Sequence, residues 1–222
     1  MILIIGASGG IGSYLANSFI NDGFDVKGTY NNTAINNNFT KLDVSNEEEV
    51  KQWVEQISAK LKQITVINCV GINYNCFGHK ADLEQWKNVI DVNLIGTFNV
   101  IKYLLPYMRA EKFGRIINLS SVVPQIGVAG TSAYAASKSG LWGMVKSLTK
   151  ENAGLGITIN NLNLGYFDAG MIAAVPEAVL ATIKETIPAK RFGTPNEIYK
   201  AVNMLMDIEY INGASIDING GI

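Results

Sequence analysis

Tyr134 and Lys138 are spaced so that they could work together in proton transfer. Lys138 follows Tyr134 by four positions, so a helix would place the phenol and the ammonium on one face. A neighbouring cation lowers the pKa of a phenol from about 10 towards neutral pH, which a proton donor requires. The hydroxyl of Ser121 could polarise a carbonyl group beside that phenol, and Ser120 is the alternative for this role. These residues predict proton donation to a carbonyl oxygen.

A glycine-rich segment, residues 6–12, follows the apolar run Ile2–Ile5 and leads into a helix-length stretch. The segment contains Gly6, Gly9, Gly10 and Gly12. Glycines let the backbone turn tightly and bring its N–H groups close to a pyrophosphate, which then lies at a helix N-terminus. Ser8 could add a hydroxyl to a phosphate oxygen, or it could cap the turn. Between a strand and a helix the segment predicts a dinucleotide site, with close packing as the alternative.

The elements that must position these residues alternate between short apolar runs and longer amphipathic stretches. We predict strands at 2–5, 26–30, 39–42, 64–68, 115–119, 157–164 and 214–218. We predict helices at 11–22, 82–109, 132–151 and 195–206, with a further helix that starts in a capping box from Ser45 to Glu48. Pro106 should kink or end the helix 82–109.

This alternation is typical of βαβ units and therefore of a parallel sheet. We predict one Rossmann-type α/β domain over residues 1–222, doubly wound, with helices on both faces. Its seven parallel strands should lie in the order 3-2-1-4-5-6-7.

Composition excludes several other classes of protein. Eighteen basic and nineteen acidic residues give a net charge of −1, without the basic surface that nucleic-acid binding needs. We find no apolar run near the roughly 18–20 residues that span a bilayer, and Ile2–Ile5 is too short for a signal peptide. Cys69, Cys76 and the lone His79 suggest neither a disulfide framework nor a metal site. We therefore expect a soluble cytoplasmic protein without nucleic-acid or membrane partners.

Motifs along nearly the whole chain resemble those of the short-chain dehydrogenase/reductase family. Ser121 lies thirteen residues before Tyr134, as the family's serine does, and Tyr134 with Lys138 matches its Tyr-x-x-x-Lys pair. The other matching positions are Gly6, Gly10 and Gly12, the segment 68–71, Asn93, the segment 191–198 and the ending 219–221. The resemblance implies an NAD(P)-dependent oxidoreductase.

The resemblance also implies a role for each matching residue. Tyr134 would donate the proton, and Lys138 would lower its pKa and bind the nicotinamide ribose. Ser121 would hold the substrate oxygen, and Asn93 would position a water molecule that leads to Lys138. The implied cofactor contacts are Gly6, Ser8, Gly9, Gly10, Ile11, Gly12, Tyr30, Asn31, Asn32, Asp43, Val44, Asn68, Cys69, Val70, Gly71, Asn93, Tyr134, Lys138, Gly165 and Phe167.

Some positions depart from the family pattern. Leu164 stands where the family has a proline. Ala169 stands where the family has a threonine that contacts the nicotinamide amide, so in this chain the backbone at Phe167 would make that contact. The segment from Tyr30 to Lys41 is too short for the usual helix, so the adenosine pocket should be open. No acidic residue occupies 29–33 to repel a 2′-phosphate, which favours NADP(H). NAD(H) stays the alternative, because Gly9 replaces a frequent basic residue.

The chain is most similar to 3-oxoacyl-acyl-carrier-protein reductases, through 117–123 and 132–140. The lid 169–185 is apolar, with Met171, Ile172, Val175, Val179 and Leu180, and so is the loop 124–131. An acyl-carrier partner would need basic residues at the mouth, for which Lys102, Arg109, Lys112 and Lys190 are candidates. The alternative substrates are a keto-sugar or a small hydrophobic ketone, and a catalytically silent NADP-binding regulator is a further alternative. The resemblance also implies a homotetramer or homodimer that pairs through 82–109 and 132–151.

Overall fold

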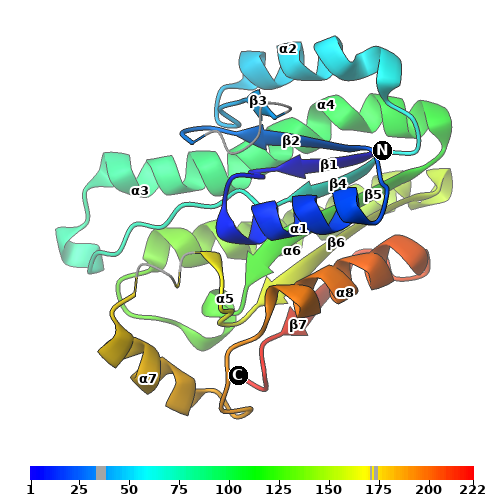
Figure 1. Ribbon diagram of the computed structural model, residues 1–222. Helices are drawn as coiled ribbons and strands as arrows, with labels where there is room; N and C mark the ends of the chain where they lie inside the picture. Colours follow the sequence, from blue (N-terminus) through cyan, green and yellow to red (C-terminus); the bar gives the residue numbers. More distant parts are fainter. Residues whose placement is uncertain (34–38, 171, 173–174) are drawn as a thin grey trace.

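Seven parallel strands form one sheet in the predicted order, β3-β2-β1-β4-β5-β6-β7, with helices on both faces (Figure 1). The computed structural model describes residues 1–33, 39–170, 172 and 175–222, so Met171 and part of the segment from Tyr30 to Lys41 lie outside the described residues. The strands are β1 Ile2–Ile5, β2 Val26–Tyr30, β3 Thr40–Lys41, β4 Thr65–Asn68, β5 Gly114–Ser121, β6 Ile157–Leu164 and β7 Ser215–Ile218.

The helices in the described residues lie close to the predicted ranges. They are α1 Gly10–Asn21, α2 Glu47–Ile57, α3 Leu83–Ile90, α4 Gly96–Glu111, α5 Val123–Ile126, α6 Ser132–Asn152, α7 Glu177–Thr186 and α8 Pro195–Asp207. The short helix α5 was not predicted, and neither was α7, which lies in the segment described above only as an apolar lid. The capping box at Ser45 was wrong by one residue, because Asn46 caps α2 by accepting from the Glu49 backbone N–H. The Ser45 hydroxyl instead donates to Asp43 at 2.6 Å.

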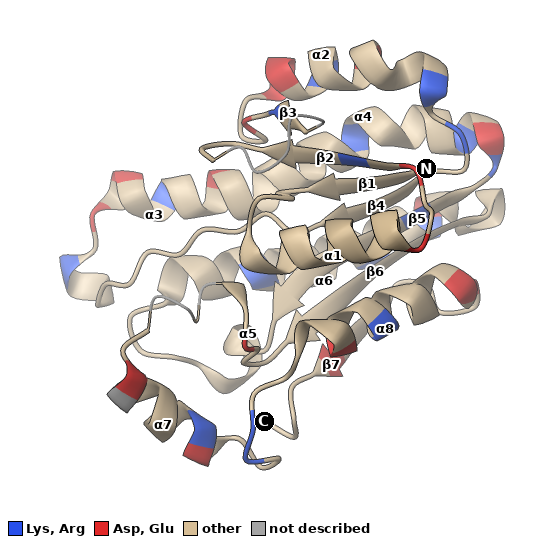
Figure 2. Ribbon diagram, viewed as in Figure 1, with Lys and Arg blue, Asp and Glu red and all other residues tan. Residues whose placement is uncertain are grey.

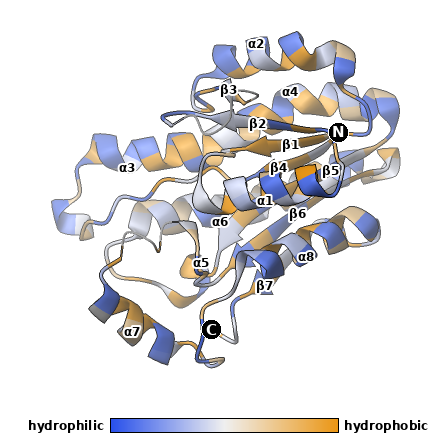
Figure 3. Cartoon of the chain, viewed as in Figure 1, coloured by the Kyte–Doolittle hydropathy of each residue, from blue (hydrophilic) through white to orange (hydrophobic). Residues whose placement is uncertain are grey.

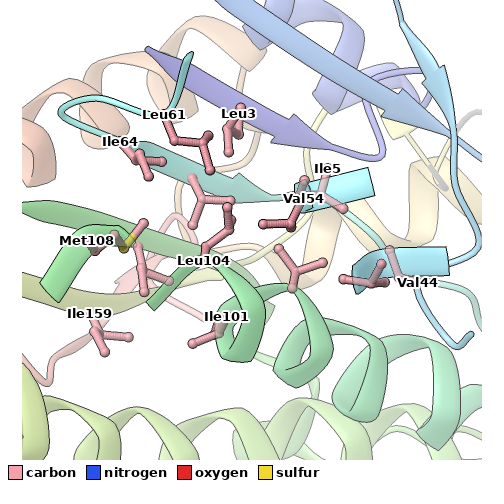
Figure 4. Close-up of a cluster of buried hydrophobic side chains, with 14 of the residues drawn as sticks. Leu3, Ile5, Val44, Val54, Leu61, Ile64, Ile101, Leu104, Met108 and Ile159 are labelled. Carbon is pink, nitrogen blue, oxygen red and sulfur yellow. The ribbon is translucent and has the colours of Figure 1, made fainter. Parts of the chain in front are cut away.

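The sheet is buried on both sides, which explains the continuous apolar runs of its central strands. Leu3 and Ile5 of β1 face the layer of α2, α4 and α6, in the cluster that Figure 4 shows around Leu104 and Met108. Ile2 and Ile4 face the other way, towards α1 and α8. Apolar residues accordingly concentrate along the central strands in Figure 3, and polar residues on the outer sides of the helices.

The predicted helix 82–109 is a longer helical run, Leu83–Glu111, with a change in the middle. α3 passes into a π-helical segment, Asp91–Ile95, and then into α4, which continues through Pro106 to Glu111. Pro106 therefore does not end this helix, and the kink predicted there stays a prediction. By length and composition alone this run could cross a membrane, contrary to the expectation that no such run exists, and 44% of its most apolar stretch is buried inside the protein. One such helix is weak evidence, because core helices of soluble proteins pass the same test.

Candidate active site

Ser121, Tyr134 and Lys138 meet where β5 ends. β5 extends two residues beyond the predicted strand, so Ser121 is its last residue, while Tyr134 and Lys138 lie one turn apart on α6. All three are buried, with exposed fractions of 6%, 8% and 4%. The Lys138 Nζ lies 5.7 Å from the centre of the Tyr134 ring, and the Ser121 hydroxyl lies close enough to the Tyr134 phenol to influence its pKa. The carboxyl edge of the sheet thus assembles a phenol, a hydroxyl and an ammonium.

Burial raises the pKa of the Tyr134 phenol, and the hydrogen bond with Ser121 opposes that rise. The net shift is therefore upward, opposite to the expected lowering, because burial is its largest cause in the protein alone. The ammonium lies over the face of the ring and donates to the Leu119 carbonyl oxygen at 2.8 Å. Consequently Tyr134 keeps its proton at neutral pH, as a proton donor must.

Lys138 is a buried cation with few partners. Burial lowers its pKa from 10.5 to about 8, and nearby Cys69 has a smaller, opposite effect. An ammonium has three donors, of which the bond to Leu119 uses one. A Cβ atom at Gly71 would lie 3.5 Å from the Lys138 Nζ and 3.8 Å from the Asn93 Oδ1, so the glycine keeps the space beside the ammonium open. The two remaining donors of the ammonium are available to an acceptor there.

The π-helical segment places Asn93 at the centre of this region, fully buried. Its Nδ2 donates to the Ile72 carbonyl oxygen at 2.9 Å, and its Oδ1 accepts from the Ile72 N–H at 2.8 Å. The same Nδ2 lies 3.1 Å from the Ser137 hydroxyl oxygen. Asn93 therefore holds the loop after β4 against α6, whereas its predicted contact with a water molecule stays a prediction.

Ser120 does not share the site of Ser121. Its hydroxyl donates to the Lys138 carbonyl oxygen at 3.4 Å and accepts from the Trp142 indole N–H at 3.2 Å. These contacts attach β5 to the backbone of α6, away from the Tyr134 phenol. The structure thus favours Ser121 for contact with a substrate oxygen.

The glycine turn forms a cradle at the N-terminus of α1. Gly6 has a φ of +82°, and a Cβ atom at Gly12 would lie 2.3 Å from the Gly6 carbonyl oxygen. Thr29, at the end of β2, accepts from the Gly6 N–H through its hydroxyl and from the Ala7 N–H through its carbonyl oxygen. The first N–H groups of α1 have no partner within the helix, so they suit a pyrophosphate. Sequence reasoning missed Thr29, because its partners lie on another strand.

The remaining predicted cofactor residues all follow carboxyl ends of strands. Asn31 and Asn32 are exposed after β2, while Tyr30, which ends β2, is half-buried. Asp43 and Val44 follow β3. The Val44 side chain is buried against Gly96, and the Asp43 carboxylate caps the turn before α2 by accepting from the Ser45 N–H. Cys69, Val70 and Gly71 follow Asn68 at the end of β4, and Gly165 and Phe167 follow β6.

Two close contacts position the loop after β6. A Cβ atom at Gly10 would lie 2.6 Å from the Gly170 nitrogen, so this loop contacts the glycine turn. A Cβ atom at Gly165 would lie 2.7 Å from the Asn219 Cα, and the Gly165 N–H donates to the Ile218 carbonyl oxygen. The glycines therefore bring the glycine turn, the loop after β6 and the C-terminal segment together.

The loops and short helices at the carboxyl edge present exposed apolar side chains. Phe77, Ile126, Val128 and Val179 are all exposed, and a hydrogen bond from the Cys76 N–H to the Gly130 carbonyl oxygen joins two of these loops. His79 lies beside Phe77, with ring centres 6.3 Å apart. On α7, acidic and basic residues alternate without forming a basic patch (Figure 2).

The structure does not gather the four basic residues proposed for an acyl-carrier partner. Lys112 directly precedes β5, at the edge of the sheet opposite Ser121, and Arg109 binds Asn152 at the same end. Lys102 forms an ion pair with Glu47 on α2. Lys190, in the segment between α7 and α8, donates to the Glu185 carbonyl oxygen.

Comparison with known proteins adds an independent line of argument. A family model described as enoyl-(acyl carrier protein) reductase matches residues 6–222. An acetoacetyl-CoA reductase of Shinella zoogloeoides is 36% identical over 232 residues, covering 99% of this chain and 96% of that protein. A 3-oxoacyl-acyl-carrier-protein reductase of Thermotoga maritima is 38% identical over 184 residues, covering 82% and 75%. Nodulation protein G of Azospirillum brasilense is 35% identical over 237 residues, covering 99% and 96%.

Proposed function

The chain belongs to the short-chain dehydrogenase/reductase family, a family of NAD(P)-dependent oxidoreductases, and we propose that it reduces 3-oxoacyl thioesters with NADPH. The observation that carries this proposal is the meeting of Ser121, Tyr134 and Lys138 beside the space that Gly71 leaves open. The glycine turn, at the same edge of the sheet, suits the cofactor's pyrophosphate.

A bound nicotinamide supplies the hydride, and the residues of this chain supply the proton. Ser121 donates a hydrogen bond to the substrate carbonyl oxygen and orients it towards Tyr134. The O–H bond of Tyr134 then breaks as the new O–H bond of the alcohol forms, which leaves a phenolate. The Lys138 ammonium, 5.7 Å from the ring centre, stabilises that negative charge electrostatically.

The preference for NADPH rests on the end of β2. Thr29, Tyr30, Asn31 and Asn32 contribute no carboxylate that would repel a 2′-phosphate, and the two asparagine side chains are exposed and able to donate. Titrating the protein with NADPH and with NADH, followed by fluorescence, tests this preference. Tighter binding of NADH would contradict it.

The proposed substrate class rests on the relatives' names and on the loops of the carboxyl edge. Two of the relatives named above reduce 3-oxoacyl groups, one on coenzyme A and one on a carrier protein. Exposed apolar residues such as Phe77 and Val128 suit an acyl chain better than a sugar phosphate. Three residues separate Tyr134 from Lys138 in this chain, whereas the corresponding gap in enoyl reductases is longer. This spacing argues against enoyl reduction, although the description of the matching family model names an enoyl reductase.

One substitution tests whether the protein is an enzyme or a silent NADP-binding regulator. Tyr134→Phe removes the proton donor and keeps the ring, so kcat should fall by about 10²–10⁴-fold while NADPH binding changes little. Oxidation of NADPH with an acetoacetyl thioester, a keto-sugar and a simple diketone measures both the activity and the substrate class. Activity on the other ketones without activity on the thioester would reject the acyl proposal. A wild-type protein that is inactive on all three would favour the regulator.

We also propose that the chain assembles as a dimer or tetramer through α3, α4 and α6. Leu83, Ile95 and Phe98 are exposed apolar residues of this helical run, with exposed fractions of 61%, 44% and 40%. A second copy would bury them. Light scattering at micromolar concentration tests the proposal, and a monomer would overturn it.

A further inference from the structure

Two rows of polar side chains cross the central sheet near its carboxyl edge, two residues apart on β5, β6 and β7. In the first row, Asn68 donates to Asn118 at 2.7 Å, Asn118 to Asn161 at 3.1 Å, and Asn161 to Ser215 at 3.0 Å. These residues are partners in the register of β4, β5, β6 and β7. The first row therefore connects strands with one another.

The second row leaves the sheet and reaches two helices of the active site. The Asp217 carboxylate accepts from the Asn163 Nδ2 at 2.8 Å, and from the Gln125 Nε2 at 3.0 Å. The Asn163 Oδ1 accepts from the Trp142 indole N–H at 3.0 Å, and that N–H also contacts the Ser120 hydroxyl. One carboxylate oxygen on β7 thereby holds α5 through Gln125 and α6 through Asn163.

The chemistry of the groups fixes the direction of these bonds. A carboxylate only accepts hydrogen bonds and an indole N–H only donates them, so the Asn163 amide must face Asp217 with its nitrogen and Trp142 with its oxygen. Asn163 is 1% exposed, so an amide turned the wrong way would leave buried polar atoms unpaired. Asp217 itself is exposed and lies on the edge strand β7.

Both arms end next to residues of the active site. Trp142 follows Lys138 by one helical turn on α6. Ser120 accepts from the same indole N–H and donates to the Lys138 carbonyl oxygen. Gln125 lies on α5, the helix that begins shortly after Ser121. The Ser121 hydroxyl accepts from the Val123 N–H of that helix. The position of α6 relative to the end of β5 sets the distance between Tyr134 and Ser121.

We infer that Asp217 is a positioning residue for the reaction: through Asn163 and Trp142 it fixes α6, and through Gln125 it fixes α5, so that Ser121 and Tyr134 face the same substrate oxygen. The inference rests on the proposed reductase function. Asp217 touches neither the catalytic side chains nor the cofactor turn, so its loss should affect turnover and spare cofactor binding.

The experiment compares Asp217→Ala with Ser215→Ala, the matched end of the first row on the same strand. Small displacements of reacting groups cost large factors in rate, so we expect Asp217→Ala to lower kcat about tenfold, with the Kd for NADPH within about twofold of wild type. Ser215→Ala should leave kcat unchanged. Asp217→Asn keeps an acceptor oxygen and should restore most of the activity. A kcat for Asp217→Ala equal to that of Ser215→Ala would overturn the inference.

A double variant tests the route through Trp142. Trp142→Phe keeps an aromatic ring and removes the indole N–H, so Asp217→Ala combined with Trp142→Phe should lose no more activity than the worse single variant. Multiplied losses would show that the two residues act independently and would contradict the α6 arm.

Hydrogen exchange separates this inference from the proposed function. Backbone amides of α5 and α6 should exchange about tenfold faster in Asp217→Ala than in Ser215→Ala, whether or not a substrate is turned over. A wild-type protein without carbonyl reduction would refute the proposed function alone. Equal exchange in the two variants would refute the positioning role.

Discussion

Two buried cations, Arg115 and Lys138, lie near opposite ends of β5 and have very different surroundings. Arg115, 2% exposed at the start of the strand, donates to the carbonyl oxygens of Gly114, Gly156 and Met206 and forms an ion pair with Glu209. Its guanidinium also lies 4.4 Å from the centre of the Phe113 ring. Lys138, 4% exposed near the end of the strand, donates to Leu119 alone among the described partners.

The difference separates a structural charge from one that is available for chemistry. The amino edge of the sheet satisfies its cation with several acceptors, so Arg115 ties β5 to the segment before β6 and to the end of α8. The carboxyl edge leaves its ammonium with unused donors and a pKa lowered to about 8. Buried groups with few partners reduce stability and are retained at functional sites. We therefore expect substitutions of the two cations to affect stability in opposite directions.

Lys138→Met should give the largest effect. Without the ammonium, neither the ribose nor the phenolate of Tyr134 is stabilised, so kcat for carbonyl reduction should fall at least about 100-fold. The same change removes a buried charge, and the free energy of unfolding should rise by about 1–3 kcal/mol at pH 7. NADPH oxidation and urea unfolding measure the two effects. Lys146→Met, an exposed position on the same helix, is the control, and a destabilised Lys138→Met would contradict the comparison.

Arg115→Met should show the reverse pattern. It leaves the carbonyl oxygens of Gly156 and Met206 without their donor, so the free energy of unfolding should fall by about 2–4 kcal/mol. Because the residue lies at the edge away from Tyr134, the folded variant should keep its kcat. Urea unfolding with activity measured below the transition tests both statements, against exposed Lys200→Met as control. Loss of kcat with unchanged stability would show that Arg115 is not a structural charge.

The sequence predicted correctly those strands that are marked by a pattern of neighbouring residues. Ile2–Ile5 and Ile157–Leu164 are strands with the predicted bounds, since continuous apolar runs suit strands that are buried on both faces. The strand order was also predicted correctly. Ser121, Tyr134 and Lys138 were identified from spacing and family resemblance, and the structure brings them together.

What the sequence could not predict depends on contacts between distant segments. Arg115 reads as a polar residue at the start of a strand, yet its partner Glu209 is 94 positions away. Asp217 lies 92 positions from Gln125. The raised pKa of Tyr134 follows from burial that spacing alone does not reveal, which is why a helical Tyr–Lys pair suggested the opposite shift.

The pH dependence of stability should sharpen the comparison further. Between about pH 8 and 10.5 the unfolded chain keeps a proton on Lys138 that the folded protein has lost, so this group's contribution to stability rises with pH. The rise amounts to about 3 kcal/mol over that window, and below pH 8 the contribution is constant. Urea unfolding of wild type and Lys138→Met at pH 7–10 should therefore show a difference that shrinks as pH rises.

That comparison has two internal controls. Burial raises the pKa of Cys69 to about 12, so this thiol destabilises the fold at alkaline pH in both wild type and Lys138→Met. The contribution of Cys69 therefore largely cancels in the stability difference between the two proteins. An arginine side chain adds no titration step in this range, so the stability difference between wild type and Arg115→Met should not change with pH. A constant difference for Lys138→Met as well would mean that Lys138 does not titrate in this window.

The smallest expected effect concerns the exposed partner of Arg115. The Glu209 side chain is 72% exposed while that of Arg115 is 3% exposed, so water and salt screen the carboxylate. Glu209→Gln keeps an acceptor oxygen and leaves the carbonyl oxygens of Gly114, Gly156 and Met206 bound to the guanidinium, so the free energy of unfolding should fall by less than about 1 kcal/mol. The loss should shrink further in 1 M salt, as urea unfolding at two salt concentrations can measure. A loss as large as that of Arg115→Met would instead mean that the ion pair, and not the backbone carbonyl groups, makes this cation structural.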